Sequence, residues 1–199
     1  MTDSRTGGRP LTVVLCGVGG QGTILAADLL ARAAMNDGYD VKVSEIHGMA
    51  QRGGSVSTTV RFGDHVHSMV AGPEGADVVV SFELVEALRA LPLLAADGRL
   101  VANDVAIAPM SVLAGLAAMP ADPRGALLEA LGERATVTDA VAVATAAGNP
   151  TCANVALLSA AAGFLPITRA AWERAIESRV PPKTLQANLS AFAASYAGQ

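Results

Sequence analysis

Cysteine is scarce in this 199-residue chain, which contains only Cys16 and Cys152, each in apolar surroundings. An iron–sulfur cluster usually requires four thiolates, and a structural zinc site requires four cysteine or histidine ligands. The sequence has no Cys-x-x-Cys pair either. We therefore expect no cluster or metal on this chain alone, and we expect both thiols to pack as small buried hydrophobic groups.

Long apolar runs and an excess of positive charge are also missing. The longest apolar stretch, residues 155–167, is interrupted by serine, glycine and proline, and residues 1–10 lack the apolar segment of a signal peptide. Lysine and arginine number 14 against 18 aspartates and glutamates, which gives a formal net charge of −4 without a basic stripe. These features predict a cytoplasmic protein that binds neither nucleic acid nor membrane.

Two common catalytic signatures are absent too. The sequence contains no Gly-x-Ser-x-Gly nucleophile elbow and no phosphate-binding Gly-x-x-x-x-Gly-Lys-[Ser/Thr] loop. His65 and His67 alternate as strand residues do, but no carboxylate is placed to complete a metal site with them. An exposed strand edge is therefore the preferred interpretation of this pair.

What the sequence does contain is a repeated alternation of strand and helix patterns. Buried strands are predicted at residues 11–16, 40–44, 76–82, 99–103 and 135–138. Helices are predicted at residues 22–36, 83–94, 122–131, 140–147, 152–164, 168–178 and 183–196. Residues 55–62 alternate like a strand and, with residues 65–70, favour a hairpin.

This order of elements predicts an α/β, Rossmann-like fold. The expected sheet is mostly parallel with helices on both faces, and an antiparallel hairpin and a helical C-terminal cap complete the architecture. The length suits one domain, which we place at residues 11–199 after a flexible N-terminus at residues 1–10.

A glycine turn follows the first predicted strand and opens the first helix. Its glycines satisfy Gly-x-Gly-x-x-Gly, a pattern that brings backbone N–H groups close to an anion at a helix N-terminus. Glu45 follows Gly22 by 23 residues, where dinucleotide-binding folds place a ribose-binding acid. One hypothesis is therefore a free-standing NAD(P)-binding oxidoreductase, and a tight turn without a ligand stays open beside it. The candidate cofactor-binding residues are Gly17, Gly19, Gly20, Gln21 and Gly22.

The densest group of polar side chains lies beyond the second predicted strand, at the same edge of the sheet as the glycine turn. It offers a carboxylate, an imidazole, an amide and a guanidinium within eight residues. Such a loop is suited to anion binding, acid–base chemistry or contact with another chain, although an internal pair between Glu45 and Arg52 is an alternative. The candidate site or interface residues are Glu45, His47, Gln51, Arg52, Gly53 and Gly54.

Four sequence blocks together resemble the gamma-type component of the 2-oxoacid:ferredoxin oxidoreductases. They are GVGGQG at 17–22, SEIHGMAQRGGSV at 44–56, VRFG at 60–63, and GN followed by N at 148–154. The likeness extends over almost the whole chain and is nearest to the indolepyruvate-oxidising members. It implies oxidative decarboxylation of indolepyruvate or another aryl pyruvate to an acyl-CoA.

The resemblance also implies a division of labour between subunits. A large alpha subunit would carry thiamine diphosphate and the iron–sulfur clusters and pass electrons to ferredoxin. This chain would hold no cofactor alone and would be inactive alone, with coenzyme A near the interface. From the resemblance we transfer only the positions that match its motifs. These are the glycine turn at 17–22 and the candidate residues of the loop from Glu45 to Gly54. No catalytic residue follows from the resemblance, and a homo-oligomer stays open.

Overall fold

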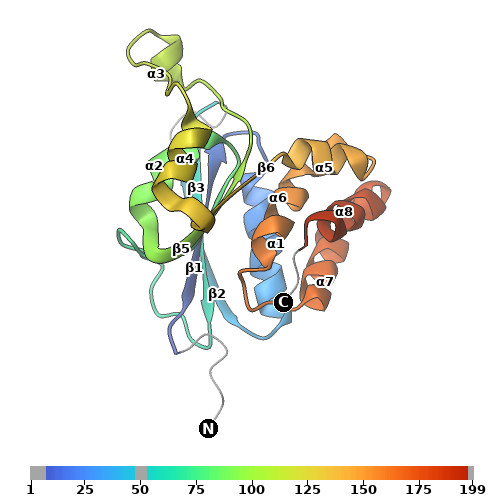
Figure 1. The fold of residues 1–199 in the computed structure, drawn as a ribbon. Coiled ribbons are helices and arrows are strands. Elements are labelled where there is room, and N and C mark those ends of the chain that lie inside the picture. Colours follow the sequence, from blue (N-terminus) through green and yellow to red (C-terminus); the bar gives the residue numbers. More distant parts are fainter. Residues whose placement is uncertain (1–7, 48–52, 197–199) are drawn as a thin grey trace.

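The computed structural model describes residues 8–47 and 53–196, and within them the chain forms an α/β sandwich around a six-stranded sheet (Figure 1). The strands are β1 (Leu11–Val18), β2 (Asp40–His47), β3 (Ser55–Gly63), β4 (Ala76–Ser81), β5 (Leu94–Asn103) and β6 (Ala135–Thr138). The helices are α1 (Thr23–Asn36), α2 (Leu84–Ala90), α3 (Met110–Leu113), α4 (Pro123–Leu131), α5 (Ala140–Ala146), α6 (Ala153–Ala162), α7 (Arg169–Arg179) and α8 (Pro182–Ser195), with short 3₁₀ turns at Leu91–Leu93, Gly132–Arg134 and Pro150–Cys152.

The sheet is mixed, with strand order β2-β3-β1-β4-β5-β6. Strands β1, β4, β5 and β6 pair in parallel, whereas β3 runs antiparallel to both of its neighbours, β1 and β2. Strands β1 and β2 therefore point the same way, and their carboxyl ends meet at one edge. The mostly parallel α/β fold with an antiparallel pair and a helical C-terminal cap is confirmed.

Helices cover both faces of the sheet, as predicted. On one face α1 and α6 contact the strands, and α7 and α8 pack outside them; α2 and α4 lie on the other face (Figure 1). Alternate residues of β1 serve the two layers: Val13 and Leu15 join the core under α1 and α6, while Val14 and Cys16 join the core under α2.

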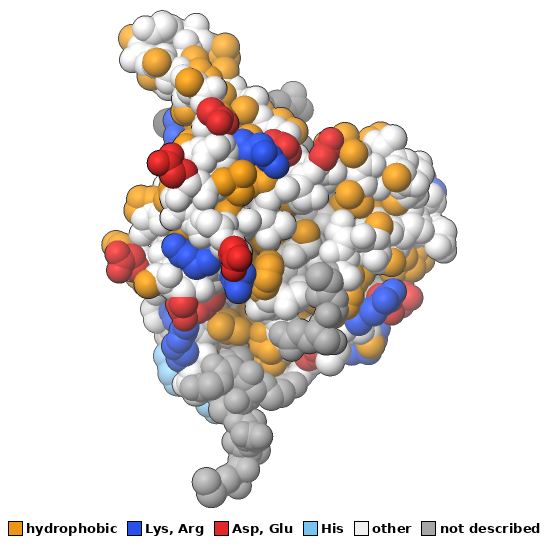
Figure 2. Space-filling view, in the orientation of Figure 1, with side chains coloured by type: hydrophobic (Ala, Val, Ile, Leu, Met, Phe, Trp, Pro, Cys, Tyr) orange, Lys and Arg blue, Asp and Glu red, His pale blue; other side chains and the backbone are white. Residues whose placement is uncertain are grey.

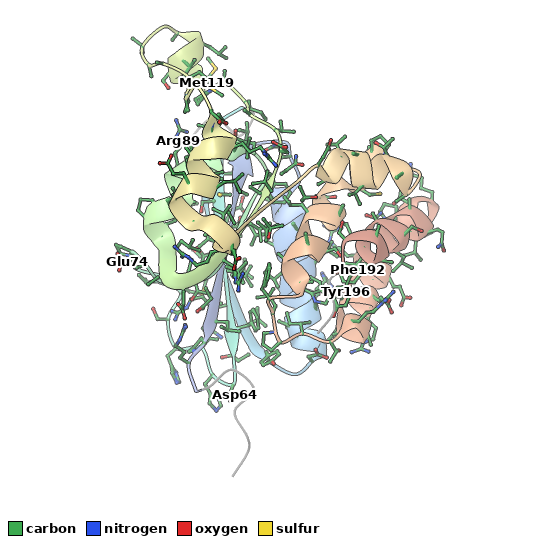
Figure 3. All side chains as sticks on the ribbon, viewed as in Figure 1. Asp64, Glu74, Arg89, Met119, Phe192 and Tyr196 are labelled. Carbon is green, nitrogen blue, oxygen red and sulfur yellow. The ribbon has the colours of Figure 1, made fainter. Side chains whose placement is uncertain are left out.

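The C-terminal helices are held by a buried aromatic group. The Trp172 ring of α7 lies 5.9 Å from the Phe192 ring of α8, centroid to centroid, and Phe192 lies 5.1 Å from Tyr196. Figure 3 shows Phe192 and Tyr196 together at the outer helical layer. The cap is therefore continuous with the main core and is not a separate unit.

The antiparallel pair is not the one predicted. Residues 65–70 form no strand, and β3 pairs with β2 and β1 instead. Side chains satisfy backbone groups of this segment: the Asp40 carboxylate accepts from the Val66 N–H, and the Arg61 guanidinium donates to the carbonyls of Ser68 and Val70. Because these groups are already bonded, the segment does not pair with β3 as the second half of a hairpin.

Most predicted element boundaries are close to the observed ones, but three strands are longer: β1 continues to Val18, β2 continues to His47, and β5 starts at Leu94. The helix predicted at residues 83–94 is correspondingly shorter, because α2 ends at Ala90. A register irregularity between Ala76 and Val78 of β4 accommodates the early start of β5. No helix in residues 8–47 or 53–196 has the length and hydropathy of a membrane span.

Candidate functional site

The glycine turn lies at the carboxyl end of β1, in the centre of the sheet. Its shape is fixed by Gln21, whose side-chain Oε1 accepts from the Val18 N–H at 2.7 Å and whose Nε2 donates to the Phe82 carbonyl at 3.1 Å. The side chain thus closes the turn and ties it to the residue that follows β4. Gln21 holds the turn in place with its own amide group, which leaves the neighbouring glycines to face outward.

Three glycines of the turn are required for different reasons. Gly20 and Gly22 have φ values of 104° and 84°, in the left-handed region that other residues rarely adopt. A Cβ at Gly17 would lie 2.8 Å from the Phe82 Cβ, and one at Gly22 would lie 2.9 Å from the Asn154 amide nitrogen. The backbone can make this turn only without side chains at these points.

Helix α1 begins at this turn with a free N-terminus. Gly22 is the N-cap and supplies no side-chain hydrogen bond, and the first turn contains no acidic residue. Thr23, the first residue of α1, is 3% exposed. The unpaired N–H groups and the helix dipole favour an anion at this end of α1.

A cavity of about 340 Å³ opens at the start of α1. It is lined by Gly19, Gly20, Gly22, Thr23, Ile24, Glu45 and Val56. The turn and Glu45 therefore share one cavity, although β3 lies between β1 and β2. In dinucleotide-binding folds the ribose-binding acid ends the strand next to β1, and here β3 takes that place, so Glu45 lies one strand farther away.

The second candidate segment is only partly described. Gly48, Gln51 and Arg52 lie outside the described residues, as does the side chain of His47. Gly53 and Gly54, at its end, bond directly to the turn: the Gly19 N–H donates to the Gly54 carbonyl at 2.9 Å, and the Gly53 N–H donates to the Gly19 carbonyl at 3.5 Å. The turn and the end of the loop are thus connected through their backbones. We call residues 17–22 together with Gly53 and Gly54 the ledge.

Two buried glutamates that the sequence analysis did not select lie beside this ledge. Glu83 is 1% exposed and caps α2: its carboxylate accepts from the N–H groups of Val85, Glu86 and Ile107. The signal for Glu83 was its place between a buried strand and the next helix, where a side-chain oxygen can accept from the N–H groups of the first helical turn.

Glu86 connects α2 to the ledge. Its carboxylate accepts from the Ser55 hydroxyl and from the Arg89 guanidinium, and it is nearly fully buried. A second cavity of about 310 Å³ lies here. Its lining consists of Val18, Gly53, Gly54, Ser55, Glu83, Glu86, Arg89, Ile107, Ala108, Pro109, Met110 and Ser111. The ledge therefore has cavities on both sides, one at α1 and one at α2.

The remaining titratable candidates do not assemble into a site. His65 and His67 are exposed and stack with ring centroids 6.2 Å apart, as expected for a solvated edge. No group of three histidine, cysteine, aspartate or glutamate residues suited to a metal ion occurs within the described ranges. Both cysteines are buried and free.

Burial controls the chemistry of the two thiols. Desolvation raises the pKa of Cys16 to about 12, and it also raises the pKa of Cys152. A protonated thiol is a poor nucleophile and a poor metal ligand. Neither cysteine is therefore suited to nucleophilic chemistry in the folded chain.

The Cys16 thiol predicts a measurable pH dependence of stability. The unfolded chain loses this proton near the ordinary pKa of 9.0, whereas the folded chain keeps it to about 12. The free energy of unfolding should therefore fall between about pH 9 and 12, more in the wild type than in Cys16→Ala. Urea titrations across this range measure the difference, and parallel pH profiles for the two proteins would contradict the prediction.

Comparison with known proteins covers nearly all of the chain. The family model described as pyruvate ferredoxin/flavodoxin oxidoreductase matches residues 12–198. The protein called indolepyruvate oxidoreductase subunit IorB from Thermococcus kodakarensis is 42% identical over 186 residues, which are 90% of this chain and 91% of that protein. Its namesake from Archaeoglobus fulgidus is 37% identical over 194 residues, covering 94% of each.

Solved structures share the fold at lower identity. The gamma subunit of a keto/oxoacid ferredoxin oxidoreductase from Geobacter sulfurreducens superposes with a TM-score of 0.69 at 24% identity, over 94% of this chain and 96% of that one. Pyruvate oxidoreductase subunit PORC from Thermotoga maritima superposes with a TM-score of 0.71 at 24% identity, with the same coverage of both chains. A third structure is a 2-oxoglutarate:ferredoxin oxidoreductase from Magnetococcus marinus with 2-oxoglutarate, coenzyme A and succinyl-CoA bound. It superposes with a TM-score of 0.68 at 16% identity, over 94% of this chain and 31% of that one.

Proposed function

The chain belongs to the pyruvate ferredoxin/flavodoxin oxidoreductase family, and on that premise we propose that it is the gamma-type subunit of a thiamine-dependent 2-oxoacid:ferredoxin oxidoreductase. The observation that carries the proposal is the match over residues 12–198, together with relatives named as subunits. The chain has two cysteines, whereas an iron–sulfur cluster usually requires four thiolates. We assign thiamine diphosphate and the iron–sulfur clusters to a large partner subunit, which passes electrons to ferredoxin.

The proposed substrate is indolepyruvate or another aryl pyruvate, decarboxylated oxidatively to the acyl-CoA by the assembled enzyme. The names of the relatives at 37–42% identity support this choice. The chain would be inactive alone, because the carrier of the reacting 2-oxoacid is thiamine diphosphate on the partner. We propose that residues 11–199 act as one cytoplasmic gamma-type domain in that complex.

The α1 cavity suits one phosphate-bearing end of coenzyme A. The N–H groups in the first turn of α1 and the Thr23 hydroxyl are hydrogen-bond donors toward an anion. Gly17 and Gly22 keep the turn free of side chains that would move it. Glu45, at the same cavity, is an acceptor for a ribose hydroxyl, since its charge would repel a phosphate. Coenzyme A itself supplies the thiol that takes up the acyl group.

The ledge is proposed to face the partner subunit. Gly53 and Gly54 bond to the turn, so a partner seated on the loop from Glu45 to Gly54 would lie directly beside the α1 cavity. His47, Gln51 and Arg52 are assigned to that face by their place in the sequence alone. This arrangement lets the gamma-type chain complete a coenzyme A site at the boundary between two subunits.

The decisive experiment is reconstitution with the large subunit from the same genome, recognised by its thiamine and Cys-x-x-Cys motifs. We expect the complex to reduce methyl viologen in the presence of an aryl pyruvate and coenzyme A, and neither subunit alone to do so. A series of pyruvate, 2-oxoglutarate, phenylpyruvate and indolepyruvate then ranks the substrates by kcat/KM. Full activity of the isolated chain, or no gain on mixing, would refute the proposal.

The free-standing NAD(P) hypothesis keeps one favourable observation, the cavity shared by the glycine turn and Glu45. The insertion of β3 between β1 and β2 counts against it, because in dinucleotide-binding folds the ribose-binding acid ends the strand next to β1, and here β3 is that strand. Calorimetry of the isolated chain with NAD(H) and NADP(H) decides between the two. Binding tighter than about 100 μM, roughly −5.5 kcal/mol, would favour the nucleotide enzyme.

A further inference from the structure

Between β5 and α4 the chain forms an arm that extends away from the rest of the molecule (Figure 1). We call residues 105–121 the apolar arm, because no residue among these 17 is charged, whereas Asp104 and Asp122 flank them on either side. Figure 2 shows the projecting part without lysine, arginine, aspartate or glutamate colours on its visible face. Such a long uncharged segment at the surface requires an explanation.

The arm holds large apolar side chains in water. Met110 is 66% exposed, Leu113 68% and Leu116 83%. The backbone around them is ordered by hydrogen bonds: the N–H groups of Leu116 and Ala117 both donate to the Ser111 carbonyl. The arm therefore presents these side chains on a defined loop, and clustered exposed apolar groups of this kind mark interaction sites.

The base of the arm is fixed to the candidate site. The Leu84 N–H donates to the Val105 carbonyl at 2.7 Å, and the Ile107 N–H donates to the Glu83 carboxylate at 3.1 Å. Residues 107–111 line the α2 cavity together with Gly53 and Gly54 of the ledge. Figure 3 places Arg89 of α2 below Met119 of the arm. The arm is thus continuous with the face assigned to the partner.

We propose that the apolar arm inserts into an uncharged groove of the large thiamine- and cluster-bearing subunit; this inference rests on the proposed function. The arm carries no charge, so it favours an apolar recess on the partner. A charged group in that recess would lose its water and find no opposite charge on the arm. Because residues of the arm and of the ledge line the same α2 cavity, one large partner is able to cover both surfaces.

A second copy of this chain is a poorer occupant on grounds of area. Three exposed side chains make a patch on the order of a few hundred Å², well below the roughly 800 Å² that each partner contributes to a stable interface. Two arms meeting about a symmetry axis would add only the same small patch again. A larger partner that also seats on the ledge supplies the missing area.

The test replaces Leu113 and Leu116 with aspartate in one double variant. We expect its association with the large subunit to weaken at least tenfold by analytical ultracentrifugation or surface binding, since two charges would enter an apolar recess. Excess variant should restore full kcat of the complex, because Leu113 and Leu116 line neither the α1 cavity nor the α2 cavity. The matched control is Met35→Asp with Val70→Asp, two comparably exposed side chains away from the arm, and it should bind like the wild type.

The outcomes separate the two proposals. If wild-type chain and large subunit do not associate, both the function and the arm assignment fail. If they associate and the double variant binds equally well, the arm assignment alone is wrong. A dimer of the isolated chain that the variant loses would assign the arm to self-association instead. A milder variant, Leu113→Ser with Leu116→Ser, answers the same question if the aspartates lower the melting temperature.

Discussion

Glu83→Ala is expected to lower the free energy of unfolding by about 3 kcal/mol or more, because it leaves three backbone N–H groups without their acceptor. Two of these groups belong to the first turn of α2 and the third to the base of the apolar arm. All three lie where the carboxylate is almost fully shielded from water. For a chain of this size the melting temperature should fall by roughly 6–12 °C.

Glu83→Gln is the matched control for this prediction. Its amide oxygen keeps one acceptor while its NH₂ group cannot replace the other, so the loss should be clearly smaller than for alanine. Asp122→Ala provides a second reference, since Asp122 caps α4 through one bond at an exposed site and should cost about 1 kcal/mol. Chemical denaturation measures the free energy of unfolding of all three variants. Equal stability of Glu83→Ala and wild type would show that the arm and α2 do not depend on this carboxylate.

Gly17→Ala is expected to disturb the turn by crowding alone, because Gly17 does not have a left-handed φ. The new Cβ would lie 2.8 Å from both the Phe82 Cβ and the Gln21 Oε1, so the closing side chain of the turn has to move. Overpacking of this kind costs about 1–3 kcal/mol of stability. Because Gln21 fixes the turn, we also expect kcat/KM of the reconstituted enzyme for coenzyme A to fall at least tenfold.

Gly20→Ala is the comparison that separates crowding from backbone strain. Gly20 has a φ of 104°, but a Cβ added there would lie in open space. The substitution should therefore lower the free energy of unfolding by about 1 kcal/mol through backbone strain, without displacing Gln21. The test compares the two variants in kcat/KM for coenzyme A and in melting temperature. A larger loss for Gly20→Ala than for Gly17→Ala would contradict it.

The sequence was sufficient to predict most elements because their signals are local. Apolar runs such as Val78–Val80, capping residues such as Asp139 and Thr168, and breaks at Pro166 and Pro181 each act within a few residues. The order of these elements predicted the fold, and the family likeness added the subunit role; the comparisons support both.

Strand pairing was harder to predict, because it depends on contacts between distant segments. Residues 55–62 had two neighbouring candidates, one before and one after them in the chain. The earlier one pairs with Val41 opposite Phe62, and Val41 packs against the core under α1 that contains Phe62 and Val60. The later candidate, residues 65–70, is polar at three of its six positions and is held by side chains instead.

The candidate site was predicted in part for the same reason. The glycine turn and Glu45 were placed at one edge by strand direction alone, and they do share a cavity. The buried carboxylates Glu83 and Glu86 were missed, because a glutamate in a sequence carries no sign of whether water reaches it. Only packing against the arm and Ser55 reveals their role.

The two backbone hydrogen bonds between Gly19 and residues 53–54 have a thermodynamic consequence. They connect the floor of the α1 cavity to the segment assigned to the partner, so a displacement on one side alters the geometry of the other. Linkage then requires reciprocity: whatever factor the docked subunit adds to the affinity for a ligand at the turn, the ligand adds to the affinity between subunits. A bound coenzyme would thereby regulate how long the two subunits stay together.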